Sequence, residues 1–227
     1  MKRVRLTICL VVVCVMAIGH AKAATVFFDG TFNNADWNST KIIDTAGDAS
    51  FSSFQVGTGG NPGQFREVNQ SLNEGRIGVS HLCSMFTYDP STQGAITSID
   101  VSYDLIEFAP LHGYEVVYGI LLFQDKTYYV GPTENLNQPS WTSFSHDGLT
   151  AADFYNDWGG GPAHPDISAT GGVIKFGFFS GNTPVGGPFN TSSGIDNLSI
   201  TINSVPEPAT LSLLAFGGLA MLRKRRA

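Results

Sequence analysis

The chain has 227 residues, of which 42% are hydrophobic and only 14% are charged, and its formal net charge is −6. Between residues 24 and 205, five Lys and Arg residues stand against 18 Asp and Glu residues, which gives this segment a formal charge of −13. A segment this acidic is expected to repel nucleic acid and anionic lipid, which excludes both as binding partners.

The first 23 residues have the pattern of a secretory signal peptide. A basic start precedes an apolar run at residues 6–19, and the small residues of Ala-Lys-Ala at 21–23 suit cleavage by signal peptidase. We therefore predict a signal helix at residues 1–23 and a mature chain that begins near Ala24. Two of the three cysteines leave with this peptide, so Cys83 is alone and an intramolecular disulfide is excluded.

Nine short runs with alternating apolar residues follow, separated by turns rich in Gly, Pro, Asn and Asp. A period of two is typical of a strand with one buried and one solvated face. The predicted strands lie at residues 24–29, 51–56, 78–88, 95–108, 114–125, 126–130, 140–146, 173–180 and 195–202. Together they predict one all-β domain at residues 24–204, an antiparallel β-sandwich of the jelly-roll type.

One segment of the domain has a helical pattern. Residues 148–158 predict a turn or two of helix, with Thr150 as the N-cap and Asp153 three residues later. The four histidines of the domain lack the spacing of a zinc site, and Cys83 predicts a buried thiol.

Asp100 and Asp104 share one face of a predicted strand. At about 3.4 Å per residue they are about 13 Å apart, outside the roughly 5–9.5 Å separation of a glycosidase acid pair. They predict a solvated strand face, and the sequence therefore contains no evident catalytic constellation.

A sugar-binding surface needs an aromatic ring that is not buried in the core, beside polar groups that contact the hydroxyls of the sugar. Trp158 lies between a short polar and aromatic run and a segment rich in Gly and Pro, where burial by regular structure is not expected. We predict that Trp158 is the platform and that its neighbours Tyr155, Asn156 and Asp157 contact the sugar. The alternative is that Trp158 folds back to plug the end of the sandwich.

The chain closes with a short apolar segment between a Pro-Glu-Pro signature and a basic cluster. Residues 209–222 form a 14-residue segment. As a helix it would be about 21 Å long, against a hydrocarbon core of about 30 Å. This helix is too short to span the membrane well as a permanent anchor. The basic residues would stay on the cytoplasmic side. The signature and the bases are Pro206, Glu207, Pro208, Arg223, Lys224, Arg225 and Arg226.

These features, in this order at the C-terminus, closely resemble the PEP-CTERM sorting domain. The resemblance covers residues 205–227 and implies recognition by an exosortase, a membrane enzyme that resembles cysteine proteases, and removal of the tail. It also implies transient anchoring in the inner membrane through the C-terminal helix. Release or transfer to the surface of a Gram-negative-type bacterium, often a producer of exopolysaccharide, would follow.

Short motifs at residues 29–37, 59–65, 139–154 and 193–200 are similar to laminin-B-type and carbohydrate-binding-module jelly rolls with the galactose-binding-like fold. The similarity implies a structural calcium, with ligands at Asp29 and Asp196. Calcium takes several oxygen ligands and would offset the repulsion among the acids. The alternative is that Asp29 merely caps a turn.

The sequence thus predicts a noncatalytic, exosortase-sorted protein that is secreted or placed at the cell surface. It would bind extracellular polysaccharide or form matrix, with signal peptidase and exosortase as partners during export. Two alternatives stay open: a polysaccharide-processing hydrolase or lyase on the same fold, and a purely structural coat protein. An enzyme would gather acids in a cleft, whereas a binding module would expose aromatics on a shallow surface.

Overall fold

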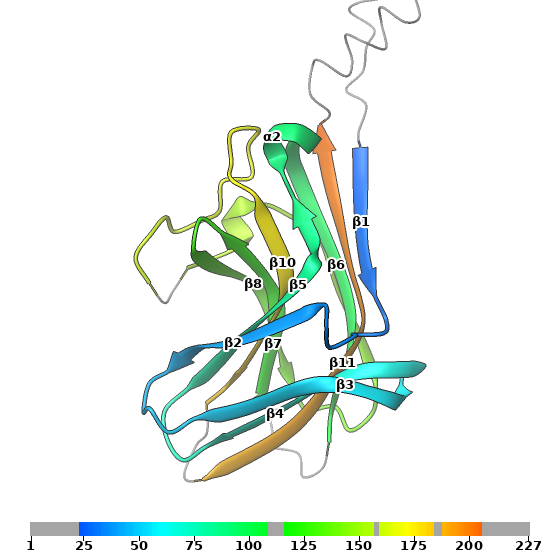
Figure 1. Ribbon diagram of the computed structural model, residues 1–227, viewed down its shortest axis with the longest axis vertical. Helices are drawn as coiled ribbons and strands as arrows, with labels where there is room; N and C mark the ends of the chain where they lie inside the picture. The colour runs from blue at the N-terminus through cyan, green and yellow to red at the C-terminus, as the bar shows by residue number, and fades with distance from the viewer. Residues whose placement is uncertain (1–22, 109–115, 157–158, 184–187, 206–227) are drawn as a thin grey trace, which may run out of the picture.

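The computed structural model describes residues 23–108, 116–156, 159–183 and 188–205. These residues form two antiparallel sheets packed as a sandwich with almost no helix (Figure 1), which confirms the predicted all-β antiparallel sandwich. The larger sheet has the order β3 (Ser50–Gly60), β4 (Gly63–Leu72), β11 (Phe189–Val205), β6 (Ala95–Glu107) and β9 (Thr142–Leu149), and β1 (Ala23–Asp29) also pairs with β11. The smaller sheet has the order β2 (Trp37–Asp44), β5 (Ile77–Tyr88), β10 (Ile174–Asn182), β7 (Val116–Gln124) and β8 (Thr127–Leu136).

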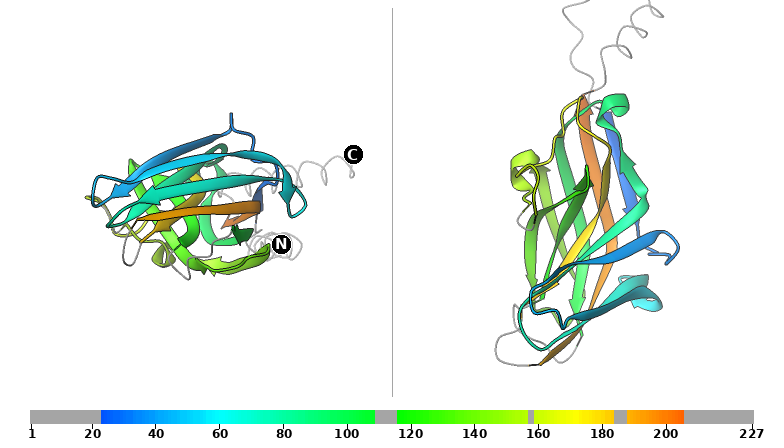
Figure 2. Two further views of the ribbon diagram at one scale, coloured as in Figure 1. Left: turned by 90° about the horizontal axis from the view of Figure 1, so that it is seen from below. Right: turned by 60° about the vertical axis from the view of Figure 1, so that its left-hand side comes forward.

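The last strand organises the larger sheet. β11 is 17 residues long and pairs along one side with β4 through residues 189–195 and then with β1 through residues 198–204. β6 pairs with its other side, and the two strands run along most of the length of the sandwich (Figure 2). Hence β1 and the β3–β4 hairpin lie end to end beside one strand.

One large apolar core fills the space between the sheets. In β11, the alternating Leu198, Ile200 and Ile202 are all fully buried. The smaller sheet contributes Phe176 and Phe178 to the same core. Because full burial of a side chain of this size contributes about 1.5–3 kcal/mol, the core can stabilise the domain without a disulfide.

The interior also contains polar groups. His81 is fully buried and its ring stacks on Phe178 at 4.2 Å, with Nδ1 2.7 Å from Ser39 Oγ and Nε2 2.9 Å from Ser180 Oγ. Burial lowers the pKa of His81 well below its ordinary value, and the charge of Arg66 lowers it further. The histidine is therefore a neutral hydrogen-bonding bridge between strands.

Two strands of the sandwich were not predicted, β2 and β4. In β4, the inward-facing side chains include Arg66 and Gln70, which are 2% and 3% exposed, whereas Phe65 is on the outward-facing register. A strand with polar residues inside and an aromatic outside shows no apolar alternation. The predicted helix is one 3-10 turn, Ala151–Asp153, and a second short helix, α2 (Pro90–Gln93), was also not predicted.

The predicted signal helix, the C-terminal segment from Pro206 onward, and Asp157 and Trp158 lie outside the described residues. Within the described part of the chain, no helix has both the length and the apolar character needed to cross a membrane.

Candidate functional site

Tyr155 and Asn156 are the members of the predicted sugar platform that the structure describes. Tyr155 is 52% exposed, and its backbone exchanges two hydrogen bonds, of 3.0 and 2.9 Å, with Val130 of β8. Asn156 closes the following loop, because its backbone N–H donates to the Ala163 carbonyl at 3.1 Å. The backbone bridge to β8 therefore holds an exposed aromatic ring beside the smaller sheet.

Tyr155 lines a hollow of about 330 Å³ at the smaller sheet, which we name the Tyr155 hollow. Its floor is apolar and is formed by Ile43, Val117, Val130 and Phe179. These residues belong to a cluster separate from the inter-sheet core, because they lie on the opposite face of their strands.

Two glycines make room for the aromatic ring of this floor. A Cβ atom at Gly78 or at Gly181 would lie 2.8 Å from ring carbons of Phe179, closer than real contacts allow. Glycine at both positions lets the Phe179 ring pack against the sheet backbone, where it is 5% exposed. The ring thereby becomes part of an apolar floor of the kind on which the C–H face of a sugar can rest.

Polar groups surround the floor. Arg76, Thr133 and Asn182 line the hollow, and Asn182 is 1% exposed. The Asn182 amide donates to Thr191 Oγ1 at 3.3 Å, but its Oδ1 accepts no hydrogen bond from the residues that the structure describes. Thr191 belongs to β11 of the larger sheet, so the Asn182 amide points between the two sheets, and Arg76 and Thr133 are the polar side chains of the hollow. The described lining residues of the hollow include no Asp, Glu or His.

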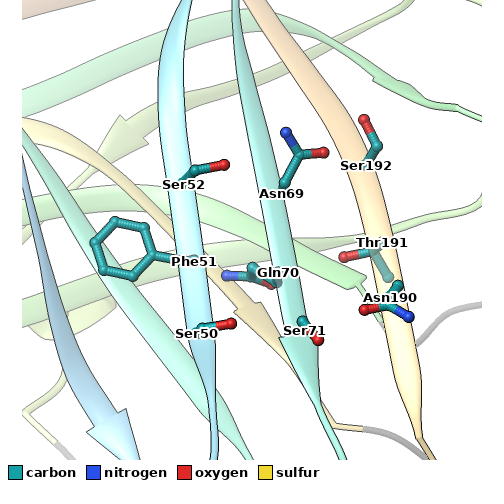
Figure 3. Close-up of a pocket in the computed structure, with 9 residues that line it drawn as sticks. All are labelled: Ser50, Phe51, Ser52, Asn69, Gln70, Ser71, Asn190, Thr191 and Ser192. Atoms are coloured by element: carbon teal, nitrogen blue, oxygen red, sulfur yellow. The ribbon is translucent and has the colours of Figure 1, made fainter.

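A second hollow, of about 400 Å³, lies at the larger sheet. Six small polar side chains from β3, β4 and β11 form its outward surface, which we name the serine–asparagine face: Ser50, Ser52, Asn69, Ser71, Asn190 and Ser192. Figure 3 shows them on the near side of the strands, whereas Phe51, Gln70 and Thr191 project to the far side. Strand register aligns the six in two rows of three. No motif in the sequence indicated this face, because its residues come from three separate segments.

Asp29, a predicted calcium ligand, is a hydrogen-bonded turn cap. Its Oδ1 accepts from the backbone N–H groups of Thr31 and Phe32, at 2.7 and 2.8 Å, and from the Thr31 hydroxyl at 2.9 Å. Its Oδ2 accepts from the Trp37 indole N–H at 2.8 Å. These donors make Asp29 the cap of this turn, which is the role that the sequence left open as the alternative.

Asp196, the other predicted ligand, is fully buried beside Asp104 of the neighbouring strand. Its oxygens accept from the backbone N–H groups of Asn61 and Asn197, at 2.6 and 2.7 Å. Burial raises the pKa of Asp196, and the charges of Asp104 and Asp29 raise it further. The described residues include no group of three or more His, Cys, Asp or Glu residues positioned to hold a metal. Calcium therefore stays a prediction.

Asp104 differs from the solvated residue that the sequence predicted. It is 8% exposed, because the tip of the β3–β4 hairpin folds over it. Asn61 and Asn197 donate to its Oδ2 at 3.1 and 2.8 Å, and Ser143 donates to its Oδ1. The pattern of β6 gave no sign of this cover, which comes from a distant hairpin.

Cys83 is fully buried, as predicted, and burial raises the pKa of its thiol. A protonated thiol inside the core is a poor nucleophile. Cys83 is thus a packing residue.

The comparisons with known proteins concern the C-terminal segment and the fold. Residues 204–226 match the PEP-CTERM protein-sorting motif, which implies export and exosortase-mediated placement at the surface or outside the cell. No curated protein matches the sequence.

Similar solved structures include carbohydrate-binding modules. The family 11 module of Clostridium thermocellum, solved with a β-1,3-1,4-mixed-linked tetrasaccharide, is 13% identical, with a TM-score of 0.48 over 81% of this chain and 98% of that chain. The CBM22-1 xylan-binding domain of Paenibacillus barcinonensis Xyn10C is 10% identical, with a TM-score of 0.42 over 82% and 99%. The K1 adhesin domain of Lys-gingipain from Porphyromonas gingivalis is 11% identical, with a TM-score of 0.42 over 78% and 97%. At this level of identity we draw no ligand or activity from them.

Proposed function

We propose that this domain is a noncatalytic glycan-binding module that holds extracellular polysaccharide in the Tyr155 hollow. The supporting observation is the half-exposed Tyr155 ring beside an apolar floor with polar groups around it. Sugars present apolar C–H faces to aromatic rings and hydroxyls to polar side chains, and Tyr155 with Arg76 and Thr133 would supply both kinds of contact in one place. Trp158 and Asp157 follow directly in the chain and complete the platform in this proposal.

Export precedes this function. Signal peptidase removes the first 23 residues, and the sorting motif holds the chain at the inner membrane until an exosortase removes the tail. The sandwich is then free to meet polysaccharide outside the cell, either released or attached to the surface. The acidity of residues 24–205 favours a neutral polysaccharide, because an acidic one would be repelled.

A glycan array probed with residues 24–205, which contain both sheets and their core, tests the proposal. We expect binding to neutral oligosaccharides, followed by titration of wild type, Tyr155→Ala and Tyr155→Phe with the best-bound one. Tyr155→Ala should weaken affinity about tenfold through loss of about 1.4 kcal/mol of ring contact, and Tyr155→Phe should retain most of it.

Phe28→Ala is the matched control, because Phe28 is an aromatic residue of similar exposure, 59%, on β1 of the other sheet. It should leave affinity unchanged. An array without any bound glycan, or a Tyr155→Ala variant with wild-type affinity, contradicts the proposal.

A further inference from the structure

The serine–asparagine face is on the larger sheet, whereas the Tyr155 hollow is on the smaller one. Its two rows, Ser52–Asn69–Ser192 and Ser50–Ser71–Asn190, follow the register of β3, β4 and β11. Neighbouring side chains are therefore about 4.8 Å apart across strands and about 7 Å apart along them. The face is a regular grid of hydrogen-bonding groups.

The face has hydrogen-bonding capacity that the protein does not use. The side chains of Ser50, Ser52, Ser71 and Asn190 form no hydrogen bond with another described residue in the structure. Polar side chains on an exposed sheet face form hydrogen bonds with water. A ligand rich in hydroxyls can replace this water and leave no polar atom without a hydrogen bond.

Glu67 orients one row of the grid. Its Oε1 accepts from both Asn69 Nδ2 and Ser192 Oγ, each at 3.0 Å. These two side chains thereby donate hydrogen bonds to the carboxylate. Asn69 Oδ1 and Ser192 Oγ remain available to accept hydrogen bonds from a ligand. Pre-orientation of this kind reduces the entropy that a ligand must overcome when it binds.

An aromatic ring adjoins the grid. Phe54 lies two residues after Ser52, opposite Glu67 in the strand register, and is 39% exposed. Part of this ring therefore stays accessible to a ligand, beside amides, hydroxyls and a carboxylate. The six residues of the face are all uncharged, which suits a neutral polyol better than an ion.

We propose that the serine–asparagine face, with Phe54, is a second binding surface for neutral polysaccharide. One molecule then binds two polysaccharide chains, one on each sheet, and cross-links them. This inference rests on the proposed function, because the Tyr155 hollow supplies the other contact.

Cross-linking is tested by light scattering, with monomeric protein mixed with soluble mixed-linkage β-glucan or soluble xylan. Binding is tested by sedimentation of the protein with the same polymers. The wild type should increase the particle radius severalfold at a protein concentration that saturates about half of the sites. Phe54→Ala and Ser71→Ala/Asn190→Ala should still sediment with the polymer but leave the particle radius at that of the polymer alone.

Stability controls separate binding from folding. Ser71 and Asn190 are exposed and contact no hydrogen-bonding partner among the described side chains, so the double variant should melt at the wild-type temperature. Ser145→Ala is the matched control, because Ser145 is an exposed serine on β9 at the other edge of the same sheet. It should cross-link like the wild type.

The two proposals fail in different ways. If Tyr155→Ala abolishes all sedimentation, the serine–asparagine face binds nothing and the inference is overturned while the proposed function stands. If the face variants abolish all sedimentation and Tyr155→Ala does not, the Tyr155 hollow binds no polysaccharide. Both the proposed function of the hollow and the cross-linking of two chains are then overturned. If the face variants cross-link like the wild type, or neither polymer is bound, the inference is wrong.

Discussion

Replacement of Asp29 by Asn is an isosteric change that removes one acceptor from a buried network. The carboxylate accepts four hydrogen bonds, three at Oδ1 and one at Oδ2 from the Trp37 indole. An amide has one oxygen, so Asn can satisfy either the turn donors or Trp37, and its NH₂ group then faces a donor. Trp37 is 6% exposed and Phe32 is fully buried, with φ of 52°, so neither donor is well placed to turn to water.

The magnitude follows from these contacts. A hydrogen bond to a charged group contributes about 1.5–3 kcal/mol, and a buried donor without a partner costs about 1–3 kcal/mol. We therefore expect Asp29→Asn to lower the free energy of unfolding by about 2–3 kcal/mol, measured by urea denaturation. Asp153→Asn is the control: that carboxylate accepts from Thr150 at the surface, and its loss should cost about 0.5–1 kcal/mol as for other caps.

The same titration decides the role of calcium at Asp29. As a cap, Asp29 should stabilise the protein by the same amount in EDTA and in calcium. If the cost of Asp29→Asn disappears in EDTA, Asp29 acts through calcium and our assignment of a cap is wrong. If the variant is as stable as the wild type in both buffers, the hydrogen-bond reasoning itself is refuted.

Three further predictions follow from other parts of the chain. Trp158→Ala should lose glycan affinity with little change in melting temperature, whereas a loss of about 3 kcal/mol in stability would identify Trp158 as a plug. Intact-mass measurement of native protein should find residues 209–227 absent; a mass that includes them contradicts exosortase processing. His81 has a lowered pKa when folded and an ordinary value near 6.5 when unfolded, so its contribution to stability is present above pH 6.5 and is lost as pH falls, by up to about 1.4 kcal/mol per pH unit. The stability of His81→Gln should therefore vary less than that of the wild type between pH 6.5 and pH 5; parallel curves would show that His81 is not the group responsible.

Local pattern was enough to predict most of the strands. In β11, each apolar residue from Leu198 to Ile202 faces the core, and a period of two can be seen in the sequence itself. The pattern failed in β4, because Arg66 and Gln70 are accommodated inside by partners from other strands, such as Ser39 and Ser180. Those partners compensate the cost of burying polar groups, and a single segment gives no information about them.

The sorting signal and the all-β class were determined by the sequence alone. A sorting motif is a contiguous segment read by another protein, and strand alternation is a property of neighbours in the chain. The two proposed binding surfaces could be found only in the tertiary structure. The serine–asparagine face joins residues near 50, 70 and 190, and the Tyr155 hollow joins Ile43 to Phe179, because antiparallel pairing places distant segments side by side. The same pairing made Asp104 a buried acceptor. The hairpin that covers it ends at Leu72, more than 30 residues before Asp104 in the chain, so the pattern around Asp104 gives no sign of it.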